Sequence, residues 1–245
     1  MNALGTGYLK PQLCIYCNRA VADTVDHIPP KLLLAKPYPE NLLTVPSCFR
    51  CNSSFQKHDE YTRVIASVDL RNANHQTVKV NMPAILRSLQ RPEAQGFSKY
   101  LASRTTPSII LASDGNPLGQ IVEVDLKRLN ATGERIVRGL HFIERELPVP
   151  PSANIRVASI PGVTAPEPKP LIQQLALLYS MCTDHRNKAV GDVFNYVAAF
   201  HPDFSVWLLV LYDEFAWAAT ITTSDTAATQ GETGDGSPSP VQKSL

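Results

Sequence analysis

The sequence predicts an α+β fold, in which a small zinc-bound module precedes a larger mixed α+β domain. Two Cys-x-x-Cys pairs near the N-terminus predict the module, because four thiolates can bind one tetrahedral zinc ion. In the rest of the chain, short β-branched and aromatic runs alternate with stretches of helical periodicity. We expect the module at residues 1–65 and the second domain at 66–222. Residues 223–245 offer little to bury, so we expect a disordered tail.

The four cysteines are Cys14, Cys17, Cys48 and Cys51, and 30 residues separate the two pairs. A hairpin that joins the pairs would form a closed structural site with Zn–S distances of about 2.3 Å. Four unliganded thiols or two disulfides are the alternatives. The N-terminus lacks the basic and apolar regions of a secretory signal, so we expect a reducing cytoplasm, where metal ligation is favoured. The remote Cys182 is expected to be a buried thiol.

Composition favours a globular protein, and the charge distribution indicates which half of the chain a phosphate-bearing partner would prefer. Apolar residues make up 44% and charged residues 18%, and no window holds the roughly 20 apolar residues of a membrane span. We therefore expect no membrane partner. Residues 1–110 carry 13 Lys and Arg against 7 Asp and Glu, whereas residues 111–245 carry 10 against 15. A phosphate group would therefore bind the first half.

Local patterns predict the order of elements in the module. Strands are expected at residues 21–28 and 41–45, each ended by proline, which cannot continue a strand ladder. A helix is expected to start at Asn52, because apolar residues then recur at helical spacing to Val68. The order is a cysteine turn, a hairpin, a second cysteine turn and a helix.

The second domain is expected to mix strands and helices. Residues 204–212 read as a central buried strand, in which Trp207 is a core residue, as is Trp217 further on. Gly133 predicts two helical pieces within residues 126–143. The other expected helices are 84–89, 98–103 and 171–179, and the other expected strands are 109–111, 120–125, 154–160, 194–200 and 215–222.

The Asp26-His27 pair lies between the cysteine pairs and is followed by Asn41 and Asn52. Phosphodiester hydrolysis requires an activated water and a positive charge near the phosphate oxygens. An imidazole with a pKa of about 6.5 can accept the proton of the water. A carboxylate and an amide oxygen can hold one hard divalent cation that keeps several waters.

These motifs together resemble those of the HNH endonuclease family, which has a ββα-metal, treble-clef-like fold. The resemblance rests on Cys14-x-x-Cys17, Asp26-His27-Ile-x-Pro30, Asn41-Leu and Cys48-x-x-Cys51-Asn52, and it covers about residues 10–65. It implies that His27 is the general base and that Asp26 and Asn52 bind catalytic Mg²⁺ or a similar ion. It further implies that Asn41 holds the hairpin loop and orients His27. Asn52 takes a position that is often histidine in the family.

The resemblance predicts a single-metal endonuclease that hydrolyses DNA, with structural zinc and catalytic Mg²⁺ as cofactors. The alternatives are a non-catalytic, zinc-stabilised nucleic-acid-binding module and a protein adaptor. Candidate phosphate contacts are Arg19, Lys31, Arg50 and Lys57, for which solvated side chains are the simpler interpretation. The sequence does not indicate the role of residues 66–222 or an oligomeric state.

Overall fold

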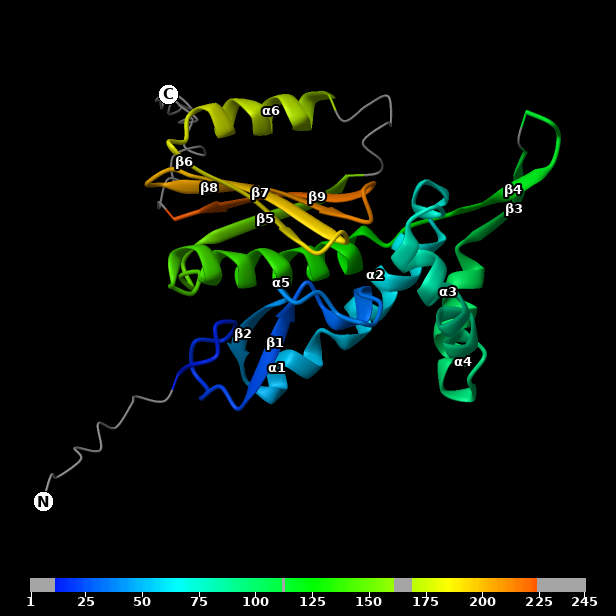
Figure 1. Cartoon of the computed structure of the whole chain (residues 1–245), viewed down its shortest axis with the longest axis horizontal. Coiled ribbons are helices and arrows are strands. Elements are labelled where there is room, and N and C mark those ends of the chain that lie inside the picture. The colour runs from blue at the N-terminus through cyan, green and yellow to red at the C-terminus, as the bar shows by residue number, and fades with distance from the viewer. Residues whose placement is uncertain (1–11, 112, 161–168, 224–245) are drawn as a thin grey trace, which may run out of the picture.

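The computed structural model describes residues 12–111, 113–160 and 169–223, and it confirms a mixed α+β fold. Figure 1 shows four layers: helix α6, a sheet of β5 to β9, helix α5, and a unit formed by β1, β2, α1 and α2. We call residues 12–68, which form the last of these layers, the cysteine unit. The predicted tail lies outside the described residues, apart from Thr223.

The cysteine unit contains the predicted hairpin. Strand β1 (Thr24–Ile28) pairs antiparallel with β2 (Leu43–Ser47). Helix α1 (Phe49–Ser54) and helix α2 (Gln56–Val68) follow. The helical segment therefore begins before Asn52, because Cys48 is already the N-cap residue after β2.

The second sheet has five antiparallel strands in the order β5-β9-β8-β7-β6. The central position of β8 confirms the prediction of a central strand. Strand β6 was not predicted, because its Asp-His-Arg-Asn-Lys sequence lacks the apolar residues of a buried strand, and it lies at an edge of the sheet. The strands are β5 (Asn154–Ile160), β6 (Asp184–Val190), β7 (Phe194–Phe200), β8 (Phe204–Leu211) and β9 (Phe215–Thr222).

Helix α5 (Leu126–Arg145) is continuous over 20 residues, so the predicted break at Gly133 is wrong. Gly133 instead permits close packing: a Cβ atom there would lie 2.7 Å from the Trp217 side chain of β9. On the other side of α5, a Cβ atom at Gly139 would lie 2.5 Å from Ile28 of β1. The two glycines allow both neighbouring layers to approach the helix closely.

One hydrophobic core joins the cysteine unit to the sheet. A single cluster of buried residues extends from Ile15 to Ile221, and the predicted domain boundary at residue 65 falls inside α2. Trp207 and Trp217 are 1% and 0% exposed, which confirms their prediction as core residues. The Trp217 indole also donates a hydrogen bond of 3.1 Å to the carbonyl of Leu129 in α5.

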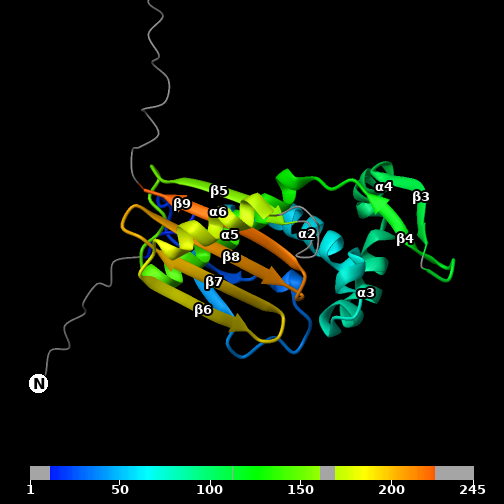
Figure 2. The same ribbon diagram turned by 90° about the horizontal axis from the view of Figure 1, so that it is seen from above.

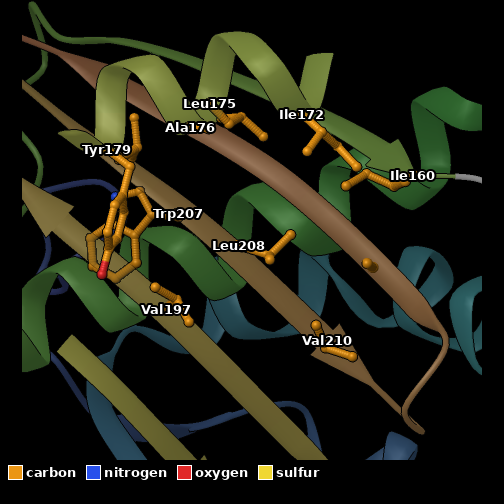
Figure 3. Close-up of a pocket in the computed structure, with 11 residues that line it drawn as sticks. Ile160, Ile172, Leu175, Ala176, Tyr179, Val197, Trp207, Leu208 and Val210 are labelled. Carbon is orange, nitrogen blue, oxygen red and sulfur yellow. The ribbon is translucent and has the colours of Figure 1, made fainter. Parts of the chain in front are cut away.

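Helix α6 (Lys169–Ser180) covers part of the outer face of the sheet. Between them lies a cavity of about 260 Å³, shown in Figure 3, with an almost wholly apolar lining that includes Leu175, Ala176 and Leu208. None of its lining side chains carries a charge.

The remaining elements lie to one side of the sheet in both Figure 1 and Figure 2. They are α3 (Gln76–Leu89), α4 (Gln95–Ser103) and the antiparallel pair β3 (Thr105–Leu111) and β4 (Pro117–Val122). Short 3₁₀ helices occur at Lys31–Leu33, Leu70–Asn72 and Pro92–Ala94. Among the helices of the described residues, none is long and apolar enough to cross a membrane.

Candidate metal centre

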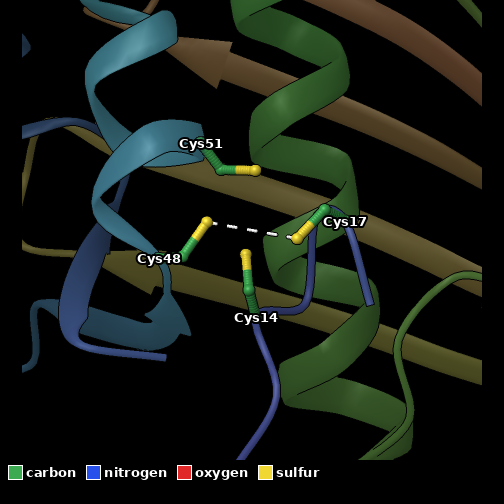
Figure 4. Close-up of side chains that lie close together, drawn as sticks. All are labelled: Cys14, Cys17, Cys48 and Cys51. Carbon is green, nitrogen blue, oxygen red and sulfur yellow. Dashed lines mark hydrogen bonds between the residues drawn. The ribbon is translucent and has the colours of Figure 1, made fainter. Parts of the chain in front are cut away.

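The four predicted zinc ligands lie together at one end of the cysteine unit. Cys14 and Cys17 belong to a turn before β1, in which the amide of Asn18 donates to the carbonyl of Cys14 at 2.8 Å. Cys48 caps α1 and Cys51 lies in its first turn. The four sulfur atoms are within 4.8 Å of one another, and Figure 4 shows them pointing toward a common centre.

These distances fit a tetrahedral metal site. Zn–S bonds of about 2.3 Å place the sulfur atoms of a regular tetrahedron about 3.8 Å apart. The sulfur atoms of Cys17 and Cys48 are 4.0 Å apart, and none of the four cysteines forms a disulfide bond, in contrast to the alternative of two disulfides. The backbone amides of Ala20 and Arg19 lower the pKa of the Cys17 thiol to about 6, whereas burial and the neighbouring cysteines raise the pKa of Cys51. Of these two groups, only Cys17 is favoured as the thiolate that zinc requires. The cluster could therefore hold a structural metal ion such as zinc.

Asp26, the first predicted ligand of the catalytic metal, is 2% exposed and already satisfied by protein groups. Its Oδ2 atom accepts hydrogen bonds from the Tyr16 hydroxyl at 2.5 Å and from Arg135 Nε at 2.7 Å. Its Oδ1 atom accepts from the His27 amide at 2.8 Å and from Arg135 Nη2. The guanidinium of Arg135 therefore binds this carboxylate at both oxygens.

Arg135 also contacts Asn52, the second predicted metal ligand. The Arg135 Nη2 atom that binds Asp26 lies 3.3 Å from the amide oxygen of Asn52. The amide nitrogen of Asn52 donates to the carbonyl of Val25 at 3.2 Å, which fixes the orientation of the side chain. One guanidinium thus bridges the oxygen atoms that the sequence assigns to a divalent cation.

A second carboxylate completes this buried cluster. Asp59 of α2 binds Nη1 of Arg135 and accepts a hydrogen bond of 3.3 Å from the Thr132 hydroxyl. Burial raises the pKa of Asp59 to about 6, against the opposing effect of Arg135. Burial lowers the pKa of Arg135, but hydrogen bonds to Asp26 and the charge of Asp59 outweigh it, so the pKa is raised.

The His27 side chain lies on the face of β1 opposite to the Asp26 carboxylate. The side chains of Asp26 and Ile28 both contact α5, and alternation along a strand directs the intervening residue to the other face. The imidazole is half-buried and accepts or donates no hydrogen bond within the described part of the chain. Burial, followed by the charge of Lys31, lowers the pKa of His27, so the ring is neutral at pH 7.

Asn41 contacts a different part of the molecule from the one expected. Its amide nitrogen donates to the carbonyl of Ala189 at 2.9 Å, and its amide oxygen accepts from the amide of Gly191 at 3.1 Å. These bonds tie the hairpin loop to the turn between β6 and β7. Within the described residues, no hydrogen bond connects Asn41 to His27.

The four candidate phosphate contacts, Arg19, Lys31, Arg50 and Lys57, are all exposed. The buried partners of Asp26 escaped prediction because Arg135 is 109 positions away in the chain and belongs to no motif of the sequence. No pattern in the sequence indicated a role for Asp59 or Tyr16 either.

Comparisons of the chain with protein-family models, curated proteins and solved structures found no match.

Proposed function

We propose that this chain is a zinc-stabilised nucleic-acid-binding protein, built on an HNH-like ββα module that does not hydrolyse its ligand. The observation that carries the proposal is the contact of one guanidinium, that of Arg135, with both Asp26 and Asn52. In an active site of the HNH type these two residues would hold the divalent cation.

An internal arginine is a poor substitute for a catalytic metal. Mg²⁺ requires near-octahedral oxygen ligands at about 2.0–2.1 Å and keeps several waters, one of which must reach the phosphate. Both oxygens of Asp26 are bound by protein donors, and the carboxylate is shielded from solvent. Arg135 supplies positive charge but neither an activated water nor an open coordination position.

The charge distribution supports a polyanionic partner that binds away from the cysteines. Residues 1–69 carry seven Lys and Arg against six Asp and Glu, whereas residues 70–104 carry six against one. This second segment contains α3 and α4. The excess predicted for the first half of the chain therefore belongs almost entirely to segment 70–104. Four of its cations, Lys79, Arg87, Arg91 and Lys99, are exposed.

The test combines a cleavage assay with a binding assay on the zinc-loaded full-length chain. Supercoiled plasmid, single-stranded DNA and RNA are incubated with the protein in Mg²⁺ or Mn²⁺. We expect intact substrates, together with retarded migration that weakens steeply as salt increases. Metal-dependent cleavage that disappears in the variant His27→Ala would contradict the proposal.

Endonuclease activity is the second candidate, and the neutral, half-buried His27 is the observation that favours it. A neutral imidazole next to solvent can act as a general base. This candidate requires Arg135 to leave Asp26 before a metal ion binds. If it is correct, the variant His27→Ala lowers the cleavage rate by ~10² or more.

A further inference from the structure

A cleft opens where the start of α2, the segment between α3 and α4, and the first turn of α5 meet. Its volume is about 620 Å³, within the range of roughly 300–1,000 Å³ that is typical of small-ligand sites. Lys57, Arg91 and Arg128 line it and come from three separate parts of the chain. Three cations that converge from distant positions favour an anionic group in the cleft.

Two aromatic rings of α4 form another part of the lining. The Arg128 guanidinium lies 5.7 Å from the ring centroid of Phe97 and 5.4 Å from that of Tyr100. The Tyr100 hydroxyl donates to Asp125 at 2.7 Å, and Arg128 Nη2 donates to the carbonyl of Lys57 at 3.2 Å. These contacts hold a cation and aromatic surface side by side, as in sites that bind a phosphate together with a base.

Two carboxylates restrict the ligand further. Glu60 and Glu93 also line the cleft, and neither forms a salt bridge within the described residues. A continuous row of phosphates would be repelled by them. Sugar hydroxyls and base amino groups, in contrast, can donate hydrogen bonds to carboxylates. The mixed lining therefore fits a nucleotide unit better than the uniform backbone of a duplex.

We infer that the cleft binds one nucleotide of a single-stranded nucleic acid, with its phosphate against Lys57 and Arg91 and its base beside Phe97 and Tyr100. This inference rests on the proposed function and specifies its ligand. Arg128 and Arg135 are seven residues apart on α5, so they share one face of the helix, about 10 Å apart along its axis. The cleft and the buried arginine cluster thus lie along the same surface of α5.

The test measures fluorescence anisotropy of labelled strands of about twelve nucleotides with the zinc-loaded full-length chain. Single-stranded DNA, single-stranded RNA and duplex DNA are compared. The variant Arg91→Glu should weaken single-strand binding at least ~10-fold and reduce the salt slope by about one. The matched control is Arg156→Glu, an equal charge change at an exposed position of β5 outside both the cleft and segment 70–104, which should change the Kd by less than ~3-fold.

A second variant tests the aromatic contact. Phe97→Leu keeps an apolar side chain against Tyr61 but removes the ring, and should weaken binding about 5-fold or more without changing the salt slope. The melting temperature of each variant verifies its folding. A preference for RNA or for DNA shows which sugar fits beside the carboxylates of Glu60 and Glu93.

The outcomes separate the two proposals. Equal losses in Arg91→Glu and Arg156→Glu, or a preference for the duplex, would overturn the inference about the cleft and leave nucleic-acid binding intact. Absence of binding by the unmodified chain at low salt would overturn the proposed function as well.

Discussion

Arg135 of α5 donates hydrogen bonds from two nitrogens to the carboxylate of Asp26 in β1, across 109 positions of sequence. The same guanidinium reaches Asp59 of α2. The cysteine unit and α5 are therefore connected by buried charges as well as by apolar packing. Since both carboxylates are shielded from water, each depends on this arginine for charge compensation.

Removal of Arg135 should destabilise the chain strongly. Arg135→Met leaves two buried carboxylates without a cation, and we expect a loss of about 3–5 kcal/mol in the free energy of unfolding. Urea denaturation at pH 7 measures the loss. The control Arg138→Met removes a partly exposed ion pair with Glu134 on the same helix and should cost no more than ~0.5 kcal/mol.

A smaller side chain at position 135 should expose oxygen ligands for a cation. In Arg135→Ala, the carboxylates of Asp26 and Asp59 lie beside the Asn52 amide with no internal positive charge. We expect Mn²⁺ to bind the variant and to raise its melting temperature, because hard cations prefer such oxygens. Electron paramagnetic resonance titration of Mn²⁺ measures the binding. Equal Mn²⁺ binding by the unmodified chain would show that the arginine does not block the site.

Loss of the cysteine-bound metal should unfold the cysteine unit. Structural zinc contributes about 10–16 kcal/mol to folding in zinc-finger peptides, which matches or exceeds the whole stability of a typical domain. We expect one zinc per chain by elemental analysis and a large decrease in melting temperature after chelation or in Cys48→Ser. The buried thiol of Cys182 is the control, since Cys182→Ala should cost only about 1 kcal/mol.

Acidification should weaken the fold through His141. Burial, followed by the charge of Arg145, lowers the pKa of His141 from 6.5 to about 4, and its Nδ1 atom has no hydrogen-bond partner within the described residues. Between these values the unfolded chain binds a proton that the folded chain does not, so stability falls as the pH decreases. The contribution is on the order of 1 kcal/mol, because the ring keeps partial access to solvent.

Urea denaturation at pH 7 and pH 5 tests this expectation. The difference in unfolding free energy between the two pH values should shrink in His141→Gln. Substitution of the exposed His185 by Gln is the matched control and should retain the dependence of the unmodified chain. An identical pH dependence in both variants would exclude His141 as its source.

A methyl group at Gly133 should disturb the contact between α5 and the sheet. In Gly133→Ala the new Cβ atom would lie 2.7 Å from Trp217 and 2.9 Å from Val157, and we expect a loss of about 1–3 kcal/mol by overpacking. Gly96 provides the opposite case, since it lies in α4 with no atom within 4 Å of an added Cβ. Gly96→Ala should be neutral or stabilising by up to about 1 kcal/mol. Thermal denaturation distinguishes the two.

The sequence correctly predicted those features that depend on residues close together in the chain. The spacing of the cysteines predicted the cluster, and the apolar runs predicted β8 and β9. The predicted break in α5 at Gly133 was wrong. Glycine has a low helix propensity, but at this position it permits a close contact with a strand that is distant in sequence. Strand β6 was missed since its place at the sheet edge depends on pairing with β7 and not on its own composition.

The candidate site was predictable only in its local part. Asp26, His27 and Asn52 follow from motifs within one short stretch, whereas Arg135 reaches them through the tertiary packing of α5. Whether a carboxylate is open to a metal depends on such long-range partners. A single sequence does not specify them.

The absence of side chains at positions 133 and 139 of α5 leaves space for Trp217 of the sheet at the first position and for Ile28 of the hairpin at the second. Because both contacts lie on one continuous helix, a small rotation of that helix would disrupt them together. The packing of the β1–β2 hairpin and that of the large sheet therefore both depend on the position of α5.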